Sequence, residues 1–164
     1  GGGGGGGASI TNLVVNDTSA TSPPSGDGIP NSQQWSVQTN FRAGVAAFGD
    51  RTVTINSTGN GSLGGKTWIR TAADSKNFTG SPLATFTLTG SFLYLLVDDR
   101  HNAAGGKPLW LDASYTDMGF NAVIAEGATL RPYSVWRKSV TSGGTVSLPR
   151  IASAIAPCYL VVVE

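Results

Sequence analysis

Apolar residues recur at every second position in a series of short segments along the chain. In residues 51–56, for example, Val53 and Ile55 share one face of an extended segment and polar residues occupy the other. A two-residue period is typical of β-strands with one buried face. We expect strands at 10–16, 51–56, 66–72, 83–89, 92–98, 133–140, 145–148 and 159–163, with residues 35–48 also extended.

One of these segments departs from the alternation. Phe92 to Val97 are six apolar residues in a row. Such a run predicts a central strand that is buried on both faces, or buried on one face and covered by aromatic side chains on the other.

Glycine, proline and asparagine separate the segments. Gly90-Ser91 predicts a hairpin between 83–89 and 92–98, and Ser142-Gly143-Gly144 predicts a second one between 133–140 and 145–148. Residues 17–31 are expected to form a loop, and 110–118 is the one segment compatible with a short helix. About 8 to 12 residues per strand favours an all-β fold, namely an antiparallel β-sandwich of jelly-roll type with at most one short helix.

Composition supports this fold class. Glutamate occurs only at Glu126 and Glu164, and there are four lysines. Because good helix formers are scarce, a helical bundle or a Rossmann-type domain is excluded. Eleven basic residues against ten acidic ones leave a net charge of +1, which argues against a nucleic-acid partner or a polybasic membrane segment.

The first seven residues are glycine. Polyglycine cannot hold a fold, so we expect a glycine linker at 1–8 and a single domain at 9–164. The glycines are either a native linker, which would imply a covalently attached upstream domain, or the remnant of an expression tag. The low charge and the many Ser, Thr and Asn residues resemble secreted bacterial domains, so we expect an extracellular monomer. Cys158 is the single cysteine, and we expect a buried free thiol.

Few residues suit catalysis. A Ser-His-Asp triad would need His101, the single histidine. The carboxylates of Asp98, Asp99, Asp112 and Asp117 include no pair that the sequence distinguishes. We therefore expect no catalytic residues and no cofactor.

A structural calcium ion is a further hypothesis. Asp17 and Asp27 lie in a turn-rich segment and carry the oxygen ligands that calcium prefers. Capping of turns by aspartate explains the same pattern.

The four tryptophans are numerous for a domain of this size. Flat aromatic rings stack on the apolar faces of sugars, so Trp110 and Trp136 are candidate ligand-binding residues; core packing is the alternative for each. The candidate polar partners are Arg70, Lys76, Asp99, Arg100 and Arg137. Arginine binds carboxylates through two parallel hydrogen bonds, so convergence of these cations would favour a uronate sugar. Internal pairing of Arg100 with Asp98 or Asp99 is the alternative.

The order of several short segments resembles a known group of domains. These segments are 68–76, 95–100, 108–111, 133–138, 142–148 and 159–163. Together they are similar to accessory β-sandwich domains of bacterial secreted polysaccharide-degrading enzymes, including pectate-lyase-like ones, over residues 9–164. Those domains close with Met-Tyr where this chain has Cys158-Tyr159.

The resemblance implies a non-catalytic carbohydrate-binding module. Its partner would be a plant or algal polysaccharide, which could be of the pectin or alginate type, and it would be linked to an upstream catalytic domain. Two alternatives stay open. One is a structural or adhesion spacer without sugar affinity. The other is a small lyase or hydrolase that uses Arg100 or His101 together with Tyr133.

Overall fold

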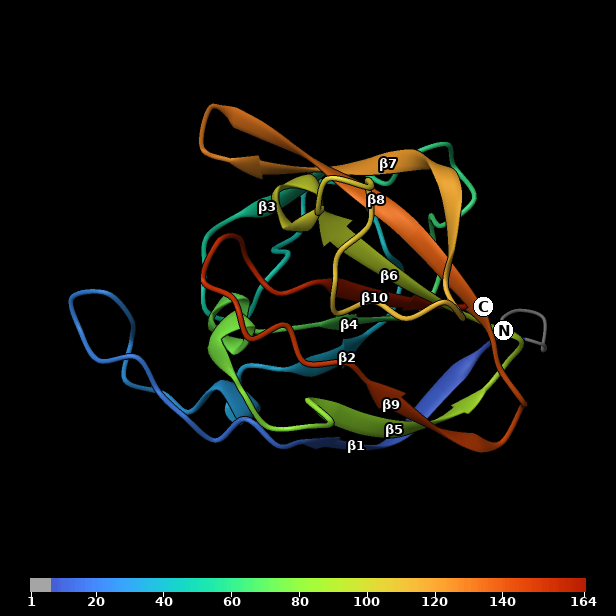
Figure 1. The fold of residues 1–164 in the computed structure, drawn as a ribbon, viewed down its shortest axis with the longest axis horizontal. Helices are drawn as coiled ribbons and strands as arrows, with labels where there is room; N and C mark the ends of the chain where they lie inside the picture. The colour runs from blue at the N-terminus through green and yellow to red at the C-terminus, as the bar shows by residue number, and fades with distance from the viewer. Residues whose placement is uncertain (1–6) are drawn as a thin grey trace.

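A computed structural model describes residues 7–164, and the greater part of the expected glycine linker, residues 1–6, lies outside the described residues. Two antiparallel sheets lie face to face (Figure 1). The smaller sheet has the order β1 (Ser9–Val15), β5 (Ala84–Thr89) and β9 (Gly144–Leu148). The larger has the order β2 (Ser36–Gln38), β4 (Trp68–Arg70), β10 (Leu160–Val163), β6 (Phe92–Asp98), β8 (Thr129–Ser139), β7 (Thr116–Glu126) and β3 (Thr54–Ser57). The predicted all-β sandwich is confirmed.

Strand β6 occupies the middle position of the larger sheet. Its odd-numbered residues, such as Leu95, face the smaller sheet and form the first core together with Phe86 and Trp136. Its even-numbered residues, such as Leu96, face a second core on the opposite side of the sheet. Because both faces of β6 are buried, apolar side chains at consecutive positions are the most stable arrangement, as predicted for 92–97.

The second core is covered by the connection between β2 and β4. This segment contributes Phe41, Phe48 and Leu63, which are at most 1% exposed. Residues 35–48, expected to be extended throughout, form only the three-residue strand β2, and the rest of the segment is irregular covering structure.

Both predicted hairpins are wrong. Strands β5 and β6 follow one another closely but belong to different sheets, and so do β8 and β9. The two connections cross between the sheets at the same end and bind each other, since the amide of Gly143 donates to the carbonyl of Leu88 at 2.7 Å and the amide of Val140 donates to that of Ser91 at 3.0 Å. A Cβ atom on Gly90 would lie 2.8 Å from the carbonyl oxygen of Glu164, so glycine is required at this crossing.

The hairpin that does form joins β7 to β8 through Gly127, which has a φ of +62°. Strand β7 was not predicted, and the short helix expected at 110–118 is absent, because that segment is a series of turns leading into β7. The helical segments of the described chain are three short 3-10 turns: η1 (Asn31–Gln33), η2 (Ala73–Asn77) and η3 (Asp99–His101). No helix among residues 7–164 is long and apolar enough to cross a membrane.

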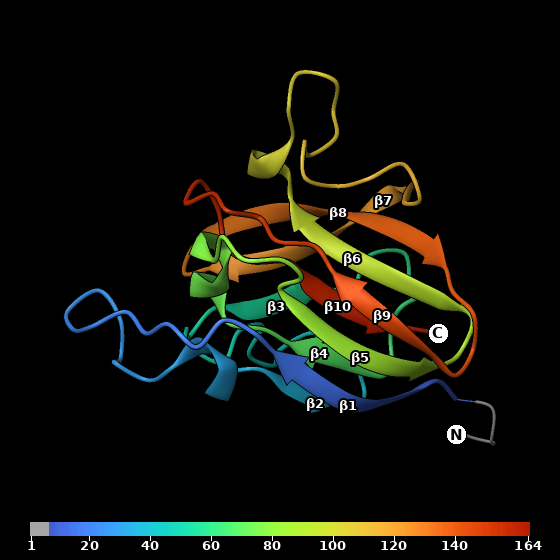
Figure 2. The ribbon, with the colours of Figure 1, turned by 60° about the horizontal axis from the view of Figure 1, so that its bottom comes forward.

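Two connections project from the sandwich. In both views the blue segment between β1 and β2 extends beyond the sheets, and in Figure 2 the yellow segment that follows η3 rises above them. The second of these contributes to the candidate site.

Candidate functional site

A groove of about 510 Å³ lies where β6 ends and the chain turns through η3. One wall comes from η3 and the segment that follows it, and the other comes from the connection between β9 and β10. The volume is within the range of about 300–1,000 Å³ that is usual for small-ligand sites. The lining residues are Arg100, His101, Asn102, Ala103, Leu109, Trp110, Arg150, Ile151, Ala152, Ser153 and Ile155.

Trp110 is the aromatic residue of the groove. Its ring lies 5.7 Å from that of Tyr159 at an interplanar angle of 32°, and 5.7 Å from that of His101 at 84°. Tyr159 is fully buried, so it supports Trp110 from the core side. Trp110 itself is half-buried and also lines the groove, so its position is fixed while part of the ring stays accessible.

His101 holds the two walls together. Its Nε2 lies 2.8 Å from the carbonyl oxygen of Pro157. Since a carbonyl can only accept, Nε2 carries the proton. Burial lowers the pKa of His101, and the hydrogen bond to Pro157 opposes that shift only in part. The imidazole is therefore a neutral structural clamp.

Arg100 lines the groove, but its charge is compensated. Its Nε lies 3.0 Å from Oδ1 of Asp98, and its Nη2 lies 2.6 Å from Oδ2 of the same carboxylate and 3.3 Å from Glu126. Asp98 is 1% exposed, and its hydrogen bonds raise the pKa of Arg100. The alternative interpretation of Arg100, an internal ion pair, is the one the structure shows, with Asp98 as the partner.

Arg150 was missed by sequence reasoning. Its side chain is exposed, and Nη1 donates to the carbonyl of Thr79 at 2.5 Å. No carboxylate of the described chain lies within ion-pair distance of it. Arg150 sits 40 residues from Trp110 in the sequence, so only the fold could bring them to one groove.

Two further features distinguish the groove. Leu109 and Ile155 are 91% and 61% exposed, a degree that is unusual for large apolar side chains. The Oδ1 atom of Asn102 is inaccessible and has no hydrogen-bond partner within residues 7–164. Because this oxygen is inaccessible, it offers no contact to a molecule in the groove.

A smaller hollow of about 200 Å³ adjoins the groove and shares Arg100 and Ile155 with it. It is also lined by Lys76 and by Arg51, which pairs with Asp50 and Asp74. Trp110, Arg100 and Lys76 therefore line adjoining hollows at one end of the sandwich.

The other candidates do not join them. Trp136 is 6% exposed and packs between the sheets, so its expected stacking role is wrong: the strand that carries it is covered on both faces. Asp99 accepts hydrogen bonds from the amide and hydroxyl of Ser134. Arg70 donates to the carbonyl of Ala46, and Arg137 lies over the ring of Phe92 at 4.3 Å. These three residues have local structural partners.

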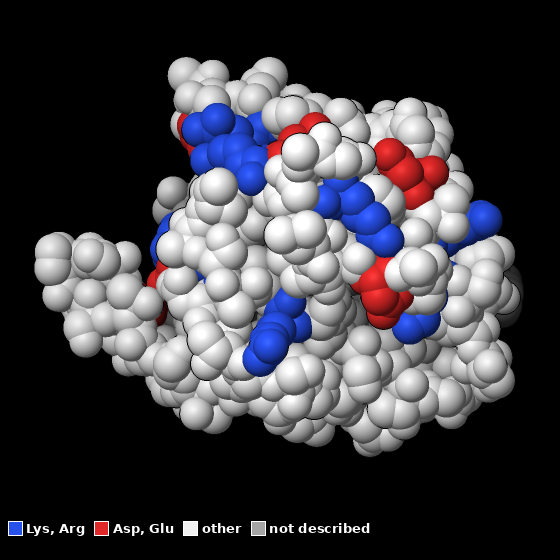
Figure 3. All heavy atoms as spheres, in the orientation of Figure 1, with Lys and Arg blue, Asp and Glu red and all other residues white. Residues whose placement is uncertain are grey.

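The basic residues form no continuous patch on the face seen in Figure 3. Their blue side chains lie in separate groups, and some of the groups adjoin red acidic side chains. On this face the distribution agrees with the small net charge, and the basic side chains form no continuous track.

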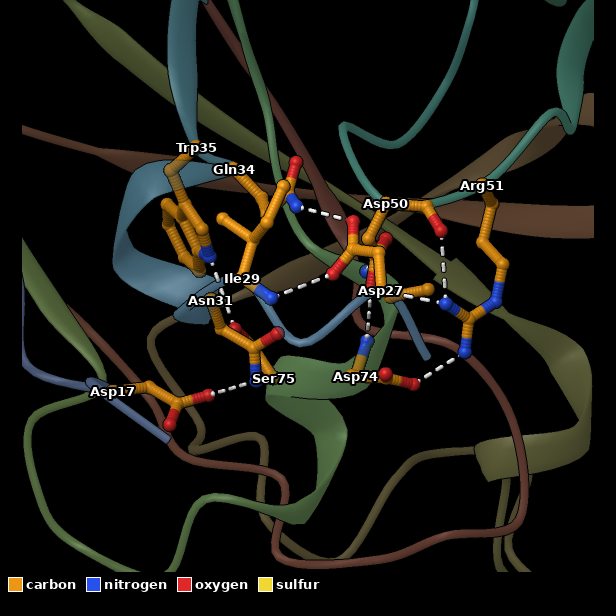
Figure 4. Close-up of polar contacts among 11 residues, drawn as sticks. Asp17, Asp27, Ile29, Asn31, Gln34, Trp35, Asp50, Arg51, Asp74 and Ser75 are labelled. Atoms are coloured by element: carbon orange, nitrogen blue, oxygen red, sulfur yellow. Dashed lines mark hydrogen bonds and ion pairs between the residues drawn. The ribbon is translucent and has the colours of Figure 1, made fainter. Parts of the chain in front are cut away.

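The two calcium candidates serve the chain itself (Figure 4). Asp17 is fully buried and accepts from Ser19 and from Nδ2 of Asn31 at 2.9 Å. Asp27 accepts from the amide of Ile29 and from Gln34. In the described part of the chain no three Asp, Glu, His or Cys side chains gather around one point. Both carboxylates thus have hydrogen-bond partners within the chain.

Tyr133 does not assist the alternative lyase arrangement. It is fully buried, and burial raises its pKa, so it cannot act as an accessible proton donor beside Arg100. The single cysteine, Cys158, is likewise buried, as expected.

The fold and groove together define an antiparallel β-sandwich domain with a small, partly apolar surface site. No family model matches the chain, and no curated protein matches it. Among solved structures it is similar to part of a β-glucuronidase from glycoside hydrolase family 2, with a TM-score of 0.67 and 18% identity. The likeness covers 84% of this chain but only 16% of that enzyme, and at this identity it concerns the fold.

Proposed function

We propose that this chain is a non-catalytic carbohydrate-binding domain and that the groove around Trp110 is its binding site. The observation that carries the proposal is the geometry of Trp110, which is held by Tyr159 and His101 with part of its ring facing a groove of about 510 Å³. A supported ring of this kind stacks on the apolar face of a sugar at little entropic cost, since its rotamer is already fixed.

Polar groups beside the ring suit the hydroxyls of a sugar. Asn102 and Ser153 line the groove with polar side chains. One stacked ring and a few hydrogen bonds correspond to weak affinity, with a Kd of about 10 μM to 1 mM. Weak binding is sufficient for an accessory domain, because a linked catalytic partner stays at high local concentration on its polymer.

A non-catalytic role is supported by the two titratable residues of the groove that sequence reasoning considered for catalysis, since both have partners within the fold. The Nε2–H of His101 donates a hydrogen bond to the carbonyl oxygen of Pro157, and Arg100 is paired with Asp98. We therefore propose a targeting role beside a secreted bacterial polysaccharide-degrading enzyme. The likeness to one portion of a β-glucuronidase is compatible with such a role.

A structural spacer is the second candidate function. The exposed side chains of Leu109 and Ile155 favour it, because apolar residues at a rim can dock against a neighbouring domain.

Affinity electrophoresis against neutral and acidic plant and algal polysaccharides tests the proposal. We expect at least one polysaccharide to retard the chain, and Trp110→Ala to abolish the retardation. Leu130→Ala is the matched control, since Leu130 is 56% exposed and does not line the groove. Circular dichroism must show that both variants stay folded. If no polysaccharide retards the wild-type chain, the sugar proposal fails and the spacer remains.

A further inference from the structure

The groove at Trp110 carries a free positive charge, and this charge comes from Arg150. The lining contains no aspartate or glutamate. Arg100 is compensated by Asp98 and Glu126, and His101 has a lowered pKa and is neutral near pH 7. Arg150 has no ion-pair partner in residues 7–164.

The guanidinium of Arg150 is also oriented. Its Nη1 donates to the carbonyl of Thr79, which anchors one corner of the fork. The remaining donors, Nε and Nη2, have no partner in the described chain, and together they match the two oxygens of a carboxylate. Arginine held in this way loses less conformational freedom on binding than a free surface side chain does.

A hexuronate combines the two features that this groove can recognise. One face of its ring is apolar and can stack on Trp110, and its carboxylate projects from the edge of the ring. No rearrangement of the core is needed, because Trp110 and Arg150 already line the same groove.

We propose that the groove binds acidic sugars, with the carboxylate of a uronate residue held by Arg150 and its ring stacked on Trp110. This inference rests on the proposed carbohydrate-binding function and specifies its ligand class.

The test compares acidic oligosaccharides with their neutral counterparts. The probes are oligomers of galacturonate, mannuronate and glucuronate, each paired with its methyl ester, and titration calorimetry measures their binding to the 164-residue chain. We expect one acid to bind about tenfold tighter than its ester, and this preference to fall as salt is added. We expect Arg150→Gln to remove the preference and Arg150→Lys to retain only part of it.

Arg42→Gln is the matched control, since Arg42 is exposed and lies outside the groove. This substitution changes the net charge by the same amount as Arg150→Gln. It should leave the preference intact. Equal binding of acid and ester, or a preference that survives Arg150→Gln, would overturn the assignment of Arg150 while leaving a neutral-sugar site in place. If none of the acids or esters binds but a neutral polysaccharide does, the acidic-sugar inference alone fails. Failure of every saccharide overturns both proposals.

Discussion

At the scale of single residues, the arginines differ chiefly in what surrounds their charge. Arg100 is bound by a carboxylate that is 1% exposed, and Arg137 lies over the ring of Phe92. Arg150 is anchored by a carbonyl and faces no carboxylate in the described chain. An ion pair formed within the fold is already satisfied and offers little to a ligand, whereas an anchored and unpaired guanidinium offers most of its charge. Whether the charge of an arginine is already paired with a carboxylate therefore matters more for anion binding than the number of arginines and lysines.

The neutral state of His101 predicts a pH dependence of stability. Burial lowers its pKa in the folded chain, so the unfolded chain binds a proton first as the pH falls below about 6.5. The free energy of unfolding should therefore decrease between about pH 7.5 and about pH 5.5. Urea unfolding across this range measures the decrease.

His101→Gln provides the comparison for this window, because His101 is the single histidine. The variant should be less stable at neutral pH but nearly flat across the window. Glu164 and Asp112 have lowered pKa values, so their contributions are lost at lower pH, below about 4.5. A variant that retains the wild-type slope would show that His101 is not the titrating group.

Burial also predicts an inert thiol at Cys158. The side chain is 0% exposed, and desolvation raises its pKa. Since the thiolate is the reactive species, a thiol-specific dye should label the native chain only as fast as the structure opens. Unfolded chain should react at once with one equivalent of dye. Rapid labelling of native protein would contradict the assigned burial.

At the scale of elements, β6 contributes to both cores and should dominate stability. Leu95 is 0% exposed, so Leu95→Ala should lower the free energy of unfolding by about 2–5 kcal/mol. Leu130→Ala, at a 56% exposed site on β8, should change it by less than about 0.5 kcal/mol. Denaturant titration of the two variants measures the difference. A small effect at Leu95 would be inconsistent with a central strand.

Strands with a strong hydrophobic pattern could be predicted from the sequence, while the strands they pair with could not. The apolar run 92–97 predicted β6 correctly, because a strand that is buried on both faces has no exposed position for a polar residue. The turns at Gly90-Ser91 and Ser142-Gly143-Gly144 marked real chain reversals, yet a turn signal does not say whether the chain re-enters the same sheet. Strand β7 was missed although it alternates, with Asp117 and Asn121 exposed and Ala122 buried, and its register to β8 shifts between Asp117 and Asn121.

The same limit applies to the candidate site. Trp110 and Arg100 were found from their local context, next to a glycine-rich loop and a carboxylate pair. Strand parity placed Trp136 on a face but could not show that both faces of its strand are covered. No sequence pattern marks Arg150. It reaches the groove because the connection between β9 and β10 packs beside the segment that follows η3.

At the scale of the whole molecule, the two cores share one sheet. Residues on the two faces of β6, Leu95 and Leu96, belong to different cores, and strand β10 divides its residues in the same way. Neither core can lose its packing without exposing the back of the other. The domain should therefore unfold in a single transition, although its apolar residues form two separate clusters.

Tryptophan fluorescence and far-ultraviolet circular dichroism test this cooperativity. Trp35 and Trp136 report on the first core, and Trp68 reports on the second. The two signals should give coincident unfolding curves in the wild-type chain. Leu95→Ala and Leu96→Ala should each lower the denaturant midpoint of both signals together, with the slope of the transition unchanged. If Leu95→Ala produced a biphasic curve in which the Trp68 signal survived the loss of the first core, the shared sheet would not couple the two cores, and each would be an independent folding unit.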